Sequence, residues 1–164
     1  NLIKNLVKKY NSQKGTVSNY VDLSYRSSNI KWFPYNNDTN WIYSKLNHLI
    51  DRANVECWNF DLYNKTEQIQ YGEYNSNEGG HYEFHMDVSD NSINRKISLS
   101  VQLSDENDYS EGDLQFFTNR KVRNATKEKG SVIIFPSYLM HRVKKVTGGK
   151  RESLVLWRHG PPLK

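Results

Sequence analysis

From residue 58 to the C-terminal region the chain consists of short runs rich in Tyr, Phe, Val and Ile, separated by clusters of Asn, Asp, Ser and Gly. Such runs are typical of β-strands joined by turns. So many short strands must pack as two sheets, which favours a β-sandwich or jelly roll. We expect about eight strands, at residues 58–63, 66–74, 80–87, 95–103, 112–118, 131–135, 139–146 and 150–158.

Before residue 58 the pattern is helical. Apolar residues recur at steps of three and four within residues 1–10 and again from Trp41 to Ala53, and Asp38 is placed to cap the second helix. We therefore predict a mostly β fold whose N-terminal helices buttress one sheet. A chain of 164 residues fits one domain, with a helical part at about 1–57 and a β core at about 58–160.

The composition indicates where in the cell the protein is expected and which kinds of partner it could bind. The sequence has no apolar run near the ~20 residues of a membrane span, and its N-terminus lacks the apolar region of a signal peptide. Its single cysteine, Cys57, cannot form an internal disulfide. We therefore expect a cytoplasmic, intracellular protein without a membrane partner. The net charge of +5 is spread over scattered basic residues, so either solvated strand edges or a surface that steers an acidic substrate would explain it.

The stretch GGHYEFHMD, residues 79–87, concentrates potential metal ligands. In a regular strand His81, Glu83, His85 and Asp87 would share one face, with Tyr82 and its alternates on the other. Iron(II) binds imidazole nitrogen and carboxylate oxygen, and a His and an Asp two positions apart can grip one ion. His81 and Glu83 lie ~6 Å or more along the strand, so we expect them at the rim. By itself the pair is a weak signal, because the same spacing occurs by chance on solvated strands.

Two further residues follow downstream, in the segment from Phe135 to Gly160. His141 falls on one predicted strand and Arg151 on the next, with Gly148–Gly149 between them as a turn. Such a hairpin would bring the two side chains together. Each residue alone is better explained as a packed histidine or a surface cation, and it is their combination with the upstream pair that indicates a site.

With these residues in view, the chain resembles the iron(II)- and 2-oxoglutarate-dependent dioxygenases, particularly the prolyl-4-hydroxylase-like, PKHD-type members. The family fold is a double-stranded β-helix (jelly roll) with N-terminal helices, which agrees with the strand pattern. The resemblance rests on His85-Met86-Asp87, Arg95-Lys96-Ile97-Ser98 through Leu103-Ser104, Glu111-Gly112-Asp113-Leu114, Phe135-Pro136-Ser137, and His141 followed ten positions later by Arg151.

The resemblance implies a role for each matching residue. His85, Asp87 and His141 would hold Fe(II), and Arg151 would bind the distal carboxylate of 2-oxoglutarate. Tyr74 would also touch that cosubstrate, although the loop after it is one residue longer than in close relatives. Trp157 would line the pocket floor, with plain core packing as the alternative. Relatives often have Gly-Gly before an acidic residue where this chain has Glu111-Gly112-Asp113, which puts the geometry of that turn in doubt.

The activity implied is hydroxylation of an unactivated carbon, most simply a peptidyl proline, with release of succinate and CO2. Fe(II), 2-oxoglutarate and O2 would be required, and the chemistry admits ascorbate. A protein or peptide is the favoured substrate, and free amino acids are a further option. One alternative is a nucleic-acid demethylase of the same superfamily, in which a second arginine usually shares the strand face of the first. Here Arg158 is seven positions from Arg151 and would point oppositely. The other alternative is a non-catalytic β-sandwich binding module without an arginine clamp.

Overall fold

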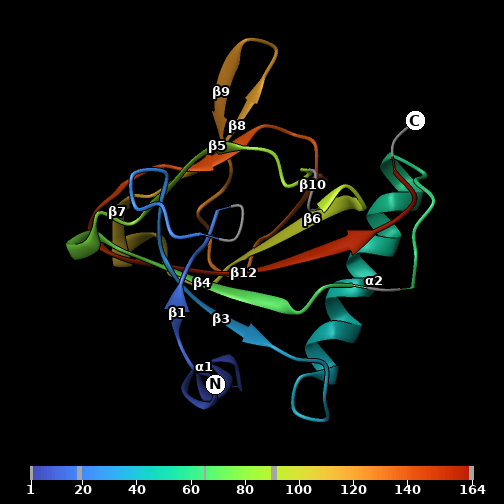
Figure 1. The fold of residues 1–164 in the computed structure, drawn as a ribbon, viewed down its shortest axis with the longest axis horizontal. Coiled ribbons are helices and arrows are strands. Elements are labelled where there is room, and N and C mark those ends of the chain that lie inside the picture. Colours follow the sequence, from blue (N-terminus) through green and yellow to red (C-terminus); the bar gives the residue numbers. More distant parts are fainter. Residues whose placement is uncertain (1, 18–19, 65, 90–91, 163–164) are drawn as a thin grey trace.

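The fold consists of two antiparallel β-sheets and two α-helices (Figure 1). The computed structural model describes residues 2–17, 20–64, 66–89 and 92–162. The larger sheet has the order β1-β3-β4-β12-β6-β10, with β7 also paired to β12, and the smaller has the order β2-β5-β11-β8-β9. The elements are α1 (Leu2–Lys9), β1 (Gln13–Lys14), β2 (Arg26–Ser27), β3 (Asn29–Phe33), α2 (Asn40–Cys57), β4 (Ile69–Asn75), β5 (His81–His85), β6 (Arg95–Gln102), β7 (Tyr109–Glu111), β8 (Leu114–Thr118), β9 (Lys121–Asn124), β10 (Val132–Pro136), β11 (His141–Val143) and β12 (Val146–His159).

The predicted architecture of a two-sheet β core covered by helices is confirmed, but the number of strands is higher than predicted. Twelve strands occur in the described part of the chain instead of about eight. The additional ones are β1, β2, β3, β7 and β9, so the stretch expected to be helical also contributes strands. Most of these are two to four residues long, too short for sequence periodicity to reveal.

The predicted strand at 58–63 does not form. Its backbone is held by a side chain of α2, because Asn54 donates to the Phe60 carbonyl (2.9 Å) and accepts from the Phe60 N–H (2.9 Å). Trp58, Phe60 and Leu62 still pack against the core. The alternation of apolar residues therefore predicted correctly that these side chains are buried, but the strand it also predicted is not there.

The helix α2 was predicted correctly, but its capping residue was not. The N-cap is Thr39, not Asp38. At the start of the helix the carbonyl of Asn36 accepts hydrogen bonds from Thr39 N–H (3.1 Å) and Asn40 N–H (2.8 Å). Asp38 is instead paired with Lys9 of α1. Within the described residues no helix combines the length and apolarity needed to traverse a bilayer.

One face of the larger sheet forms the main hydrophobic core with α1 and α2. In Figure 1 both helices lie on the side of this sheet away from β5, β8 and β9. Alternate positions of each central strand point toward the helices, as expected from the two-residue period of a strand. The core residues contributed by the sheet are Phe33, Ile69, Tyr71, Ile97, Leu99, Val101, Leu154 and Leu156.

The opposite face of the larger sheet is buried yet polar. Between the core residues of β6 and β12 lie buried positions that face the smaller sheet, and several of these line a cavity of about 420 Å³. A polar face inside a sandwich costs free energy unless it meets partners or ligands. This face is therefore where a site is expected, and its members include Gln70, Ser98, Ser100, Arg151 and Ser153.

The predicted hairpin around Gly148–Gly149 is wrong. Both glycines lie inside β12, where they pair with β7 across an irregular register, and Gly149 has a φ of 69°. The chain instead turns at residues 144–145, and β11 and β12 belong to different sheets. His141 and Arg151 consequently approach the cavity from opposite sheets rather than from neighbouring strands.

The turn between β7 and β8 has two successive residues in the left-handed region. Glu111 has a φ of 58° and Gly112 a φ of 65°. Glu111 therefore adopts, at some conformational cost, the left-handed backbone that a glycine at this position would adopt freely.

Candidate metal centre

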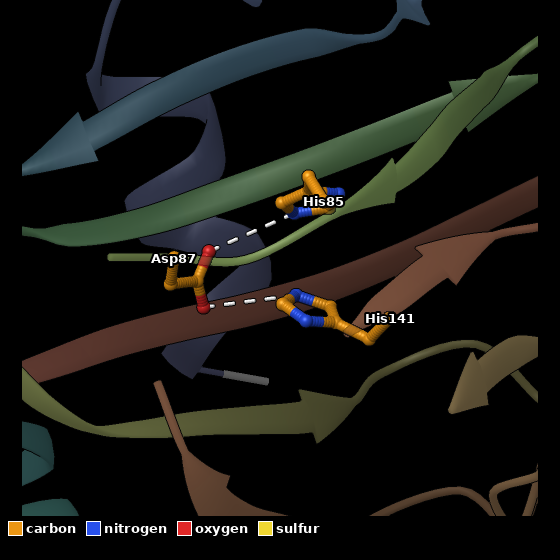
Figure 2. A group of neighbouring side chains, drawn as sticks. All are labelled: His85, Asp87 and His141. Atoms are coloured by element: carbon orange, nitrogen blue, oxygen red, sulfur yellow. Dashed lines mark ion pairs between the residues drawn. The ribbon is translucent and has the colours of Figure 1, made fainter. Parts of the chain in front are cut away.

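Two strands of the smaller sheet bring three potential metal ligands together (Figure 2). His85 is the last residue of β5, and it lies directly opposite His141, the first residue of β11. Asp87 follows β5 by two residues, and its backbone N–H donates to the carbonyl of Ser137 (2.8 Å). The chain beyond β5 is thus fixed so that the Asp87 carboxylate points back toward both imidazoles.

The ligand atoms of His85, Asp87 and His141 all lie within 4.8 Å of one another. Nε2 of His85 is 3.6 Å from Asp87 Oδ1, and Nε2 of His141 is 3.6 Å from Asp87 Oδ2. The three side chains are largely buried, with 7–10% of each exposed. Two imidazoles and one carboxylate on one side of a cavity form the donor set of a non-haem iron(II) site with open coordination positions.

Both histidines are held in the tautomer that a metal ligand needs. Nδ1 of His85 lies 2.7 Å from the Glu83 carbonyl, and Nδ1 of His141 lies 2.8 Å from the Leu139 carbonyl. A carbonyl can only accept, so each Nδ1 carries the proton and each Nε2 presents its lone pair to the centre of the cluster.

The ionisation states also suit a cation. Burial and the neighbouring His141 lower the pKa of His85 to about 3, so this imidazole is neutral near pH 7. Burial alone would raise the pKa of Asp87, but the two imidazoles and a hydrogen bond from Ser98 Oγ (2.6 Å) keep it below its ordinary value. The site therefore offers a neutral nitrogen on His85 and an ionised oxygen on Asp87 before any metal enters.

The prediction that four ligands share one face of β5 is wrong, because the strand is bulged. His85 pairs with His141 while Tyr82 pairs with Val143, so the two residues of β5 between these pairs oppose a single residue of β11. The bulge puts Tyr82 on the side of His85, and the two rings stack with centroids 3.6 Å apart. His81 and Glu83, expected at the rim, belong to neither the cluster nor the cavity lining.

Arg151 faces the same cavity from the larger sheet. It is 2% exposed, and its Nη1 donates to Ser153 Oγ (3.3 Å). Tyr74 lies directly across from it on β4, with the guanidinium carbon 5.7 Å from the ring centroid. No carboxylate pairs with Arg151 among the described residues. A buried cation left with neutral partners is suited to an anionic ligand.

Trp157 lines the same cavity and is 6% exposed. Its ring lies 4.0 Å below the guanidinium carbon of Arg95. Its indole N–H is close enough to Asp87 to help lower the pKa of that carboxyl, yet it is buried without a partner at hydrogen-bonding geometry. An unsatisfied donor beside the cluster fits a site that receives a further ligand.

Sequence reasoning missed several residues that build this site. Tyr82 reaches the cavity only because of the bulge, and Ser98 supports Asp87 from β6, where the alternation in ISLSVQ was the available signal. Arg26 and Arg95 also line the cavity. Arg95 stood in the motif but without a role, and nothing in the sequence singled out Arg26.

The fold and this site together define a class of protein: a double-stranded β-helix with a His-Asp-His metal centre and a buried arginine across the cavity. The family model described as the 2OG-Fe(II) oxygenase superfamily matches residues 69–159, a range that contains every one of these residues. The chain belongs to this superfamily. The predicted family and the predicted double-stranded β-helix are thereby confirmed.

Comparison with known proteins narrows the resemblance. A PKHD-type hydroxylase of Prochlorococcus marinus is 35% identical over 83 residues, covering 50% of this chain and 38% of that protein. One of Hyphomonas neptunium is 33% identical over 86 residues, covering 48% of this chain and 38% of that protein. This chain thus matches about two fifths of the length of these curated relatives.

Solved structures share the fold over nearly the whole chain. A Trichoplax adhaerens prolyl hydroxylase in complex with a peptide fragment of hypoxia inducible factor aligns with a TM-score of 0.82 at 19% identity, covering 97% of this chain and 75% of the other. A Pseudomonas putida prolyl-4-hydroxylase aligns with a TM-score of 0.73 at 18% identity, covering 96% and 81%. At these identities the likeness concerns the fold alone.

Proposed function

We propose that this chain is an Fe(II)- and 2-oxoglutarate-dependent hydroxylase that acts on a peptidyl proline, releasing succinate and CO2. The observation that carries the proposal is the pairing of a buried His85–Asp87–His141 cluster with a buried Arg151 across one cavity. Either feature alone would also fit a structural metal site, and it is their combination in one cavity that supports an oxygenase.

In this proposal His85, Asp87 and His141 hold the ferrous ion. When bound, iron and 2-oxoglutarate supply the oxidising chemistry, in which O2 is consumed, 2-oxoglutarate loses CO2 and a substrate C–H bond becomes C–OH. Ascorbate would act as an accessory reductant. The protein contributes the fixed Nε2 lone pairs, an ionised carboxylate and a cavity in which the ligand groups are shielded from solvent.

Arg151 would hold the distal carboxylate of 2-oxoglutarate. Its planar guanidinium can make two parallel charge-assisted hydrogen bonds, which fix orientation as well as position. Ser153 already engages one nitrogen (3.3 Å) and so limits the rotation of the fork. Tyr74, opposite Arg151, would line the same part of the cavity and contact the cosubstrate.

Aromatic residues around the metal cluster favour a proline-containing peptide. Trp32, Tyr82 and Trp157 line the cavity, and aromatic faces pack well against a proline ring in an extended chain. The similarity to proteins named prolyl hydroxylases supports the same class of substrate. Trp157 would thus form part of the substrate pocket.

The nucleic-acid alternative would need a second arginine on β12, on the strand face of Arg151, and Arg158 does not supply it. Arg158 lies on the other face of β12, where it pairs with Asp51 (3.1 Å) and donates to Asn47 Oδ1 (2.8 Å). Arg158 therefore links β12 to α2 and does not face the cavity. This observation favours a peptide over a methylated oligonucleotide.

Arg151→Ala tests the clamp. We expect the affinity for 2-oxoglutarate to fall at least tenfold to a hundredfold, because a charge-assisted pair is lost, while Mn(II) affinity measured by anaerobic calorimetry stays within about twofold. Arg123→Ala, an exposed arginine on β9, serves as the matched control. Equal losses of metal and 2-oxoglutarate affinity would remove the clamp assignment and leave the binding-module alternative standing.

The substrate class requires a separate experiment. Proline-containing peptides, free amino acids and methylated oligonucleotides are screened for coupled succinate release, with mass spectrometry of the products. The proposal predicts a gain of one oxygen on a proline of a peptide. Loss of a methyl group from an oligonucleotide would identify a demethylase instead.

A further inference from the structure

The cavity lining contains an excess of positive charge. Among the described residues that line it, three arginines carry positive charge, against the carboxylates of Glu67 and Asp87. The three are Arg26, Arg95 and Arg151. Because buried charges are costly unless they are paired, each of these arginines should have an anionic partner, either in the protein or in a ligand.

Two of the three are accounted for. Arg95 makes a bidentate pair with Glu67, with Nε–Oε1 at 2.5 Å and Nη2–Oε2 at 2.6 Å. Arg151 is neutralised in the loaded enzyme of the proposed function. There the two charges of Fe(II) and that of Arg151 balance the Asp87 carboxylate and the two carboxylates of 2-oxoglutarate. With these ligands bound, every charged group of the lining except Arg26 would have a counter-charge.

Arg26 is a buried cation with neutral partners. It is 7% exposed, and its guanidinium donates to Ser28 Oγ (2.9 Å), Gln70 Oε1 (2.8 Å) and the Thr16 carbonyl (3.3 Å). No carboxylate of the described residues lies within ion-pair distance of it. These three bonds fix the plane of the guanidinium but leave its charge uncompensated.

Arg26 also lies close to the metal cluster. Its guanidinium carbon is 4.5 Å from the centroid of the Tyr82 ring, and that ring stacks on His85 with centroids 3.6 Å apart. The Arg26 guanidinium is thus separated from the His85 imidazole by a single aromatic ring, that of Tyr82. Since an extended chain advances ~3.3–3.6 Å per residue, a group at Arg26 would be about one or two residues from a carbon that reacts at the metal.

We propose that Arg26 binds a carboxylate of the substrate, so that the enzyme selects peptides with an acidic side chain one or two residues from the hydroxylated position. This inference rests on the proposed function and specifies its substrate class. Arg26 supplies the counter-charge, while Ser28 and Gln70 hold its plane toward the cavity. Tyr82 lies against both Arg26 and His85, so the proposed carboxylate site and the metal cluster are neighbours across one ring.

The test measures the activity of each enzyme variant on each of a set of peptide variants. Peptides with a single proline carry Asp, or isosteric Asn, at each position within two residues of it. We expect kcat/KM to be at least tenfold higher for Asp at the preferred position in the wild type, and this ratio to fall to about one in Arg26→Gln. Arg26→Lys should retain part of it, and Arg123→Gln, on exposed β9, all of it. Equal activity on the Asp and Asn peptides in the wild type would overturn the inference, as would a preference that survives in a folded Arg26→Gln.

A second measurement does not depend on turnover. The protein loaded with Mn(II) and 2-oxoglutarate is heated with N-acetyl-aspartate amide or N-acetyl-asparagine amide at equal ionic strength. We expect the aspartate compound alone to raise Tm, because it binds the folded state, and the rise to vanish in Arg26→Gln. Identical Tm values with the two compounds would contradict the inference. Failure of 2-oxoglutarate to bind the metal-loaded protein would instead contradict the proposed function.

Discussion

Asp87 is the residue on which the metal centre most depends, since its carboxylate touches both imidazoles and its own support comes from serines. Ser98 Oγ donates to Asp87 Oδ2 (2.6 Å) and is itself within 2.9 Å of Ser137 Oγ. The carbonyl of Ser137 accepts from the Asp87 N–H (2.8 Å). Strand β6 and the turn that follows β10 thereby fix a ligand that lies outside any strand.

Ser98→Ala should therefore weaken metal binding without removing a ligand. Loss of an outer hydrogen bond to a ligating carboxylate typically costs tenfold to a hundredfold in metal affinity, and we expect a value near the lower end because Ser137 still holds the backbone. Calorimetric titration with Mn(II) measures the change. Ser110→Ala, an exposed serine on β7, should leave the affinity unchanged; an unchanged affinity in Ser98→Ala as well would mean that the hydrogen bond does not orient Asp87.

At the scale of residues, the sequence indicated which side chains gather around the cavity but not which residues support them. His85, Asp87, His141 and Arg151 were predicted from spacing and from the family pattern, and the structure places all four around one cavity. Tyr82 was placed on the wrong face, because a bulge changes which residues alternate and leaves no trace in composition.

At the scale of elements, β12 is the strand on which the site depends most, since it pairs with β4, β6 and β7. Its bend at Gly149 requires a glycine. A Cβ there would lie 2.0 Å from the Asp108 carbonyl oxygen, and φ is +69°. At the preceding Gly148 the nearest atom to a Cβ would be the Ser110 hydroxyl oxygen, at 3.2 Å.

Gly149→Ala should consequently destabilise the protein by about 2–4 kcal/mol, through backbone collision and a strained φ. Gly148→Ala is the matched control and should cost less than about 1 kcal/mol, because a hydroxyl can move. Urea unfolding measures both. Similar losses in the two variants would show that β7 does not pack against Gly149 as described.

Glu67, two residues before β4, joins two strands of the larger sheet near the cavity, through Arg95 of β6 and His159 of β12 (2.8 Å). Burial alone would raise the pKa of Glu67, but Arg95 and His159 hold it below its ordinary value of 4.5. The folded state therefore binds this proton less readily than the unfolded state does. The resulting stability is present above about pH 4.5 and is lost as the pH falls through the folded pKa.

Glu67→Gln should lower the free energy of unfolding by about 1–3 kcal/mol near pH 7, and the difference from the wild type should shrink below about pH 4. Unfolding by urea at a series of pH values tests this. Glu128→Gln, at an exposed position, should show no such convergence. A difference that stays constant down to pH 3 would assign the loss to packing rather than to charge.

Elements were predictable where periodicity extended over several residues. Seven of the predicted strands and both helices are present. Strands such as β2 and β7 exist because neighbouring strands offer hydrogen bonds, whereas in the segment 58–63 the backbone of Phe60 is bound by the Asn54 side chain instead of a strand. These outcomes are decided by tertiary contacts, which sequence patterns do not contain.

At the scale of the whole molecule, the site is divided between the two sheets. The imidazoles come from β5 and β11 of the smaller sheet, whereas Arg151 comes from β12 of the larger one. A metal ion alone would reach the larger sheet only indirectly, through the hydrogen bond between Asp87 and Ser98 of β6, whereas 2-oxoglutarate, which would contact both the metal and Arg151, would link the two sheets directly. Binding of the two ligands should be strongly coupled, and each should stabilise the fold.

We therefore expect Mn(II) and 2-oxoglutarate together to raise Tm by more than the sum of their separate effects. Saturation at a hundredfold excess over Kd contributes about 2.7 kcal/mol, equivalent to roughly 5–10 °C for a chain of this size. Calorimetry under anaerobic conditions measures the shift. In Arg151→Ala the increment from Mn(II) should persist and that from 2-oxoglutarate should largely vanish, because the smaller sheet is intact and the bridge is lost. Purely additive shifts in the wild type would mean that the diacid does not span the two sheets.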